Sequence, residues 1–370
     1  MIIRTITCHD VYNYGASLQA FALQSYLEHL GHDVKIIDYK PCYQKAYGFS
    51  KMFSSNSRYS RYYKLFPFLL WMRACKNYLL SRKTIGRKRA FDDFTKRFLK
   101  LTDRFYSYNQ LVIKPPFADI YISGSDQIWN TKLPNGSDPA FYMQFGQLNT
   151  KRISYAASFA NSSIHGGYDC LVRSYLSNID SISVREVSGL NILKILGIEG
   201  VQVQDPVFLL SKSEWEFFLS KIEIPFNNKK YLLCYDLKST NGLKQRAISL
   251  SNEYHLPIVS VNDRFVCKYA DININNAGPF VFLKLILNAE YVITDSFHAT
   301  AFSIIFKKVF WAYYNCTDNT RIKDLLGMIN LSDRFNRIDN DCNVQWDIAI
   351  NRLNYLISKS KKYLKEELEK

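Results

Sequence analysis

Near its C-terminal third the sequence contains the run Tyr291-Val-Ile-Thr-Asp-Ser-Phe-His298-Ala-Thr-Ala-Phe-Ser303. Its first four residues predict a buried strand, and the small residues after His298 predict the start of a helix. A strand that stops at polar residues and continues as a helix places those residues at the carboxyl edge of a parallel sheet, where α/β proteins bind anions. We therefore take His298 as the candidate centre of a phosphate-handling site. The alternative is a capping or core histidine bonded to Asp295.

The same alternation of strand and helix runs through the rest of the chain. Residues 2–7 predict a strand, which is followed by a polar turn, an amphipathic helix that ends at Gly31, and a second strand over residues 34–39. A second series of strands and helices begins after residue 206. Two such series predict an α/β protein with two Rossmann-like domains that face each other across a cleft, with ligands at the carboxyl edges of the strands.

We predict an N-terminal domain over residues 1–205, with a basic and aromatic insertion at about 45–105. The C-terminal domain, over residues 206–345, carries the His298 site, and a helix over residues 346–370 completes the chain. The last six residues of this helix, Lys-Glu-Glu-Leu-Glu-Lys, predict a solvated end.

Two polar turns are candidate ligand-binding loops. The first is Asn13-Tyr14-Gly15-Ala16, where glycine allows a close backbone approach ahead of a helix N-terminus; a plain tight turn explains it equally well. The second, Gly124-Ser125-Asp126-Gln127-Ile128-Trp129-Asn130, follows a predicted strand. Turn and capping preferences explain its first three residues, but a tryptophan beside amides is typical of a sugar-binding pocket.

Arg185 ends a predicted strand over residues 179–184 and precedes a helix. This position suits a bidentate contact with a phosphate or carboxylate. An ion pair with the adjacent Glu186 or with another carboxylate is nearly as good an explanation.

Composition narrows the class of protein. The chain has 370 residues, of which 47% are hydrophobic and 22% charged, as in a folded protein of two domains. The eight cysteines show no paired spacing, so neither a metal site nor a disulfide framework is expected. Neither a signal peptide nor an apolar run of membrane-spanning length is apparent, and we expect a cytoplasmic protein.

The formal net charge of +15 is concentrated in one segment. Residues 51–104 contain fifteen Lys and Arg against three Asp, interleaved with aromatic side chains. Contact with an anionic membrane surface and a solvated helical surface explain this segment equally well. Nucleic-acid binding is not expected, because no motif that reads nucleic acid accompanies the charge.

The sequence resembles the polysaccharide pyruvyl transferase family. The motifs that carry the resemblance occur in the family's order over roughly residues 1–330: Asn13-Tyr-Gly-Ala-Ser-Leu-Gln19, Gly124-Ser-Asp-Gln-Ile-Trp-Asn130, Ser154-Tyr-Ala-Ala-Ser158, Ser183-Val-Arg-Glu186, Asp205-Pro206, Gly278-Pro279 and Thr294-Asp-Ser-Phe-His298. The resemblance implies a GT-B-like fold and transfer of pyruvate from phosphoenolpyruvate onto two hydroxyls of a sugar. The products are a cyclic ketal and phosphate, and no further cofactor is implied. The acceptor would be a polysaccharide unit, often carried on a lipid diphosphate, which would place the protein on the inner face of the membrane.

The reaction that the resemblance implies suggests roles for the candidate residues. We expect Arg185, Ser296 and His298 to bind the donor, His298 to act as the acid and Asp126 as the base. Better-studied members carry an arginine where this chain has Ser296, and Ala160 and Ala299 stand where many relatives have glycine. The predicted acceptor-binding residues come from the two polar turns: Asn13, Tyr14, Gly15, Ser125, Gln127, Trp129 and Asn130.

Two other functions fit the same sequence. A GT-B glycosyltransferase would use a nucleotide sugar in place of phosphoenolpyruvate. A non-catalytic protein that binds glycans or lipids would keep the fold without the chemistry, and Ser296 is the residue that favours it.

Overall fold

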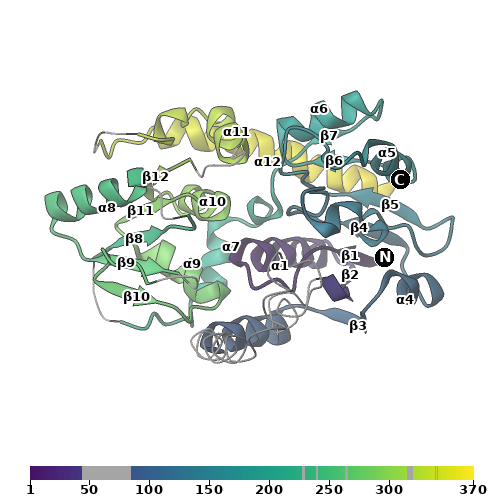
Figure 1. The fold of residues 1–370 in the computed structure, drawn as a ribbon, viewed down its shortest axis with the longest axis horizontal. Coiled ribbons are helices and arrows are strands. Elements are labelled where there is room, and N and C mark those ends of the chain that lie inside the picture. Colours follow the sequence, from purple (N-terminus) through teal and green to yellow (C-terminus); the bar gives the residue numbers. More distant parts are fainter. Residues whose placement is uncertain are drawn as a thin grey trace, which may run out of the picture.

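The computed structural model describes residues 1–43, 85–226, 230–238, 241–262, 266–314, 320–337, 339 and 341–370. Within these ranges, two parallel five-stranded sheets form the two halves of the molecule, side by side in Figure 1. The N-terminal sheet has the order β3-β2-β1-β4-β5, and the C-terminal sheet has the order β10-β9-β8-β11-β12. Both orders follow the 3-2-1-4-5 pattern of a Rossmann sheet, so the strand order reverses between β1 and β4 and again between β8 and β11.

The strands are short and mostly buried. Those of the N-terminal sheet are β1 (Ile2–Ile6), β2 (Asp33–Tyr39), β3 (Leu101–Phe105), β4 (Ile120–Ser123) and β5 (Lys151–Ser154). Those of the C-terminal sheet are β8 (Leu232–Tyr235), β9 (Ile258–Val261), β10 (Ile272–Ile274), β11 (Tyr291–Thr294) and β12 (Val309–Ala312). A separate pair consists of β6 (Ser183–Val184) and β7 (Val201–Gln202), and single bridges join Ile153 of β5 to Ser181 and Val184 of β6 to Ala157.

Helices connect the strands. In the N-terminal half they are α1 (Tyr14–His29), α4 (Tyr108–Ile113), α5 (Asp169–Leu176) and α6 (Val187–Ile195), together with a helix over residues 85–98. In the C-terminal half they are α7 (Lys212–Leu219), α8 (Asn241–Tyr254), α9 (Pro279–Asn288), α10 (Phe297–Ile305) and α11 (Thr320–Met328). Gly31 follows α1 at φ +87°, the left-handed conformation expected at a helix end.

The two halves share a hydrophobic core. Phe21 of α1 contacts the rings of Phe94 and Phe98, from the helix over residues 85–98, and those of Trp215 and Phe280 from the C-terminal half. A core that crosses from one sheet to the other fixes the positions of the two sheets relative to each other. This packing therefore limits how far the two sheets can move apart.

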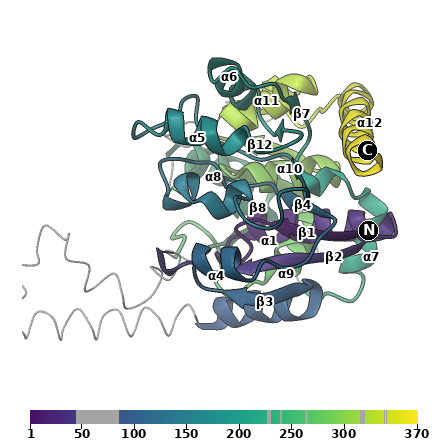
Figure 2. The same cartoon turned by 90° about the vertical axis from the view of Figure 1, so that its right-hand side faces the viewer.

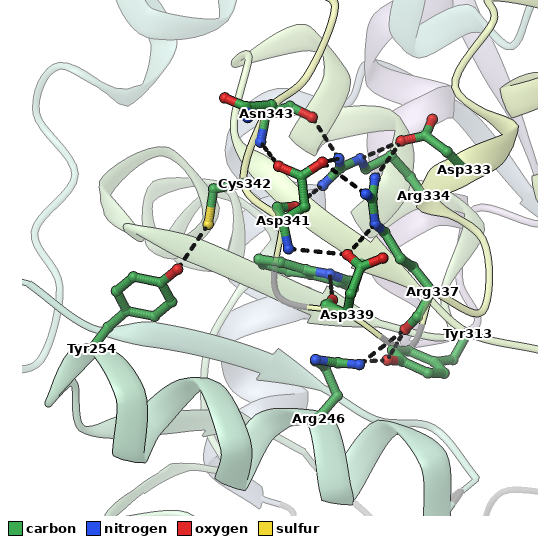
Figure 3. A network of polar contacts seen from close by, with 11 residues as sticks. Arg246, Tyr254, Tyr313, Asp333, Arg334, Arg337, Asp339, Asp341, Cys342 and Asn343 are labelled. Carbon is green, nitrogen blue, oxygen red and sulfur yellow. Dashed lines mark hydrogen bonds and ion pairs between the residues drawn. The ribbon is translucent and has the colours of Figure 1, made fainter.

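The C-terminal helix α12 (Trp346–Glu369) returns to the N-terminal half, as Figures 1 and 2 show. Ala349 and Leu353 pack into the shared core, whereas Leu364 and Leu368 pack under the N-terminal sheet. The predicted solvated end is therefore wrong in part, because Leu368 is buried and Lys151 of β5 pairs with the nearly buried Glu367. The preceding loop is fixed by the polar network of Figure 3, in which the fully buried Arg334 donates to the carbonyls of Asp341 and Asn343.

The basic insertion is described only in part. Residues 44–84 lie outside the described residues, and with them most of the segment for which membrane contact was expected. The part from residue 85 onward packs against the core through Phe91, Phe94 and Leu99. None of the described helices combines the length and the apolar character needed to cross a membrane.

Candidate active site

A cavity of about 480 Å³ lies between the two halves, at the carboxyl ends of their strands. It adjoins the loops after β1 and β4 on one side and those after β8 and β11 on the other, which are the two points where strand order reverses. Of the eleven residues predicted for the site, eight line this cavity: Asn13, Tyr14, Gly15, Asp126, Gln127, Asn130, Ser296 and His298. The other three, Ser125, Trp129 and Arg185, lie behind its wall.

His298 occupies the first turn of α10, and its side chain is only 9% exposed. A Cβ built on Gly15 would lie 1.9 Å from Nδ1 of His298, so the histidine packs directly on the glycine backbone of the opposite half. Its Nε2 lies 3.5 Å from Oδ2 of Asp205. Nε2 makes no hydrogen bond to any of the described residues. The imidazole is thus held between the Gly15 backbone and the carboxylate of Asp205, an arrangement that suits a histidine which exchanges a proton with a ligand.

Ser296 is the N-cap of α10. Its Oγ accepts a hydrogen bond from the amide of Ala299 at 3.5 Å, and its own amide donates to Thr294 Oγ1 at 3.0 Å. The N-termini of α10 and α1 both border the cavity, and Asn13 caps α1 in the same way by accepting from the amide of Ala16. Because the positive ends of two helix dipoles meet there, the cavity favours an anion.

Arg185 belongs to a buried charge cluster behind His298. Its Nη1 donates to Oδ2 of Asp205, and its guanidinium lies 3.8 Å from Glu186 and 3.9 Å from Asp126. Burial alone would raise the pKa of Asp205, but the charges of Arg185 and then His298 hold it well below its usual range. Arg185 therefore keeps Asp205 ionised next to His298. The sequence left two explanations for Arg185, a ligand contact and an ion pair. The contacts that Arg185 makes among the described residues are ion pairs.

The second polar turn divides between the cavity and the core. Asn130 donates to Oε1 of Gln127 at 2.9 Å and accepts from Asn161 at 2.7 Å, which orders three amides along the cavity wall. The structure instead places Trp129 in the core, fully buried, stacked on Tyr142 and donating to the carbonyl of Phe141.

Ser125 and Tyr14 also serve the framework. The buried Ser125 hydroxyl donates to Asp205. Tyr14 borders the cavity but is 1% exposed. Its hydroxyl donates to the carbonyl of Ala277 and accepts from Arg87.

The backbone is strained beside the cavity. Asp126 has a φ of +71° and Ala160 a φ of +57°, both in the left-handed region. Asp tolerates this region better than most residues, whereas Ala does not. Strain of this kind is retained where the surrounding structure fixes a functional geometry.

Asp295 and Arg321 are among the cavity residues that were not predicted as site residues. Asp295 follows β11, and its Oδ1 accepts from the amide of Leu237 at 2.9 Å. Burial, with Asp236 as the main nearby charge that adds to it, raises the pKa of Asp295 to about 7. Arg321, in the first turn of α11, also lines the cavity. Asp295 was within the motif already singled out, but no local sequence signal marks Arg321.

Over the described ranges, no group of three or more His, Cys, Asp or Glu side chains is placed to hold a metal ion.

The chain was compared with proteins of known sequence and structure. It is similar in structure to a putative UDP-N-acetylglucosamine 2-epimerase from Listeria monocytogenes, with 9% identity, a TM-score of 0.50, and coverage of 99% of this chain and 97% of that one. For the S. aureus MnaA–UDP structure the identity is 12%, the TM-score 0.49, and the coverage 96% and 90%. For the E. coli heptosyltransferase WaaC with ADP the identity is 9% and the TM-score 0.40, with coverage of 86% of this chain and 88% of that one.

These similarities concern the fold, and the two facing sheets have the GT-B arrangement. No curated protein sequence matches the chain. The family model for polysaccharide pyruvyl transferase matches residues 13–317, a range that includes every residue lining the cavity except Arg321. The chain thus belongs to the polysaccharide pyruvyl transferase family.

Proposed function

We propose that the protein transfers pyruvate from phosphoenolpyruvate onto two hydroxyls of one sugar unit in a polysaccharide or lipid-linked glycan precursor, forming a cyclic ketal and releasing phosphate. The observation that carries this proposal is the position of His298. It lies in a cavity between two helix N-termini, with Nε2 3.5 Å from the buried carboxylate of Asp205 and opposite a wall of amides. Such a cavity suits a small anion on one side and a sugar on the other.

The reaction requires a proton at the methylene carbon of phosphoenolpyruvate. In our proposal His298 supplies it as imidazolium, and the first sugar hydroxyl adds to the neighbouring carbon while Asp126 takes the hydroxyl proton. The bond to phosphate then breaks, and Asp295, which is partly protonated near neutral pH, gives its proton to the departing oxygen. The ionised Asp295 accepts the proton of the second hydroxyl as the ring closes. One donor and two hydroxyls thus give one ketal and one phosphate.

The amides of Gln127, Asn130 and Asn161 are proposed to orient the sugar. Their mutual hydrogen bonds fix which groups are turned toward the cavity, as is needed to discriminate one hydroxyl pattern from another. Trp129 contributes by supporting this wall from the core.

The test is incubation with phosphoenolpyruvate and a panel of lipid-linked and nitrophenyl galactosides, followed by measurement of phosphate and of acceptor mass. Release of phosphate with a gain of one pyruvyl group supports the proposal. Product formation from a nucleotide sugar and none from phosphoenolpyruvate would identify a glycosyltransferase instead. Sugar binding without turnover of either donor would identify a glycan-binding relative.

A further inference from the structure

The donor side of the cavity requires positive charge. Phosphoenolpyruvate carries a phosphate and a carboxylate, and enzymes bind such groups with guanidinium or ammonium side chains. At position 296, where the resemblance implies an arginine, this chain has a serine whose hydroxyl already caps α10. Arg185 lies behind the wall, where Asp205, Glu186 and Asp126 neutralise it.

Arg321 is placed where a cation is needed. It borders the main cavity and also a small cavity behind Phe297 that Arg185 lines. Its guanidinium carbon lies 5.9 Å from the centre of the Phe297 ring, and that of Arg185 lies 4.8 Å from the same ring. Phe297 is the residue between Ser296 and His298, so Arg321 approaches the same helix turn from α11.

The carboxylates of Glu186, Asp126 and Asp205 act on the charge of Arg321 without forming an ion pair with it. Among the described residues no carboxylate lies within ion-pair distance of its guanidinium, and its buried Nε makes no hydrogen bond. Burial, and next the charge of Arg185, lowers the pKa of Arg321 to about 10, which still leaves it charged at neutral pH. A partly buried cation without a partner costs free energy, and an anionic ligand would remove that cost.

We propose that Arg321 is the guanidinium that binds an anionic group of the donor, its phosphate or its carboxylate, and so performs from α11 the task that the resemblance assigns to residue 296. This inference rests on the proposed function. It adds to the donor site a residue of α11, and this residue belongs to none of the sequence motifs that carry the resemblance.

The experiment compares Arg321→Gln, Arg321→Lys and the control Lys323→Gln, which removes one positive charge from an exposed position of the same helix. Binding of phosphoenolpyruvate, inorganic phosphate and pyruvate is measured by titration calorimetry, and ligand-free thermal unfolding is followed in parallel. Loss of a charged hydrogen bond predicts a Kd for phosphoenolpyruvate about 10- to 100-fold higher for Arg321→Gln. Arg321→Lys should recover part of the affinity, and the control should match the wild type.

Thermal unfolding separates binding from folding. Because the unpaired charge is removed, Arg321→Gln should unfold at or above the wild-type temperature without ligand. Weaker binding of phosphate alone, or of pyruvate alone, supports the proposal and identifies which end of the donor Arg321 holds. Wild-type affinity of Arg321→Gln for all three ligands would overturn it. A wild-type protein that binds phosphate but not phosphoenolpyruvate would instead refute the proposed donor, and the phosphate titration would still decide the role of Arg321.

Discussion

Gly15, at the start of α1, lies against the imidazole of His298, at the start of α10, so closely that a Cβ on Gly15 would stand 1.9 Å from Nδ1. The two residues belong to opposite halves of the molecule, and both line the cavity. The glycine is therefore required by a neighbouring side chain rather than by its own backbone conformation.

Gly15→Ala should displace the imidazole and lower phosphate release from phosphoenolpyruvate plus acceptor by about 100-fold, because a shift of about 1 Å can misalign a proton transfer to that extent. Gly242→Ala is the matched control, since a Cβ there meets only Tyr313 at 3.6 Å. Steady-state kinetics of both variants would test this; equal activities would show that His298 adapts without cost.

His298→Ala should lower phosphate release by about 10²- to 10⁴-fold, the usual contribution of a general acid. Its melting temperature should stay near that of the wild type, because Asp205 keeps its bond to Arg185. Parallel assays of turnover and thermal unfolding measure both. A variant that retained most of its turnover would remove His298 from the mechanism.

Arg185→Ala should destabilise the fold by about 3–5 kcal/mol, because it leaves buried carboxylates without their counter-ion. Removing a residue that only contacts ligand would leave the stability of the fold unchanged. Urea unfolding gives the measurement, with the exposed Lys194→Ala on α6 as control. Wild-type stability of the Arg185 variant would contradict the role of Arg185 as counter-ion to the buried carboxylates.

Asp295→Asn should stabilise the protein at alkaline pH. The folded pKa of about 7 lies above the ordinary value of 3.8, so the folded state holds a proton that the unfolded state loses first. The wild type therefore loses stability as pH rises from about 4 to 7, by up to about 4 kcal/mol at about 1.4 kcal/mol per pKa unit. Asparagine keeps an acceptor for the Leu237 amide and carries no charge.

Melting temperatures of wild type and Asp295→Asn should thus agree at about pH 4, diverge between about pH 4 and 7 with the variant higher, and keep a constant difference above that. Parallel curves over the whole range would show that Asp295 ionises freely in the fold.

Asp126→Asn should lower acceptor-dependent turnover and leave stability unchanged, because Asn tolerates a φ of +71° as well as Asp does. Asp126→Ala tests the backbone separately and should also unfold at a lower temperature. Comparison of the dependence of turnover on acceptor and on donor measures the effect. Unchanged kinetics in Asp126→Asn would exclude it as the base.

The polar residues after strands could be located from sequence, because a strand that ends in small polar residues before a helix has few possible positions in an α/β protein. Asn13, Asp126 and His298 were found in this way, and all three line one cavity. Trp129 could not be placed, since a tryptophan next to amides has the same sequence pattern whether its ring faces a sugar or, as here, Tyr142. Arg321 was missed because its position beside Phe297 depends on the packing of α11 against α10.

The sequence alone determined the alternation of strands and helices and the loops that carry the chemistry, because local hydrophobic period and turn preferences act over a few residues. Tertiary structure alone decided which side chains face the cavity and which support it, because that depends on contacts between residues far apart in the chain. Arg185 lies beside Asp205 behind the wall, Gly15 lies against His298, and Leu368 of α12 packs under the first sheet. Each of these contacts depends on the packing of distant segments against one another, including the return of α12 to the N-terminal half.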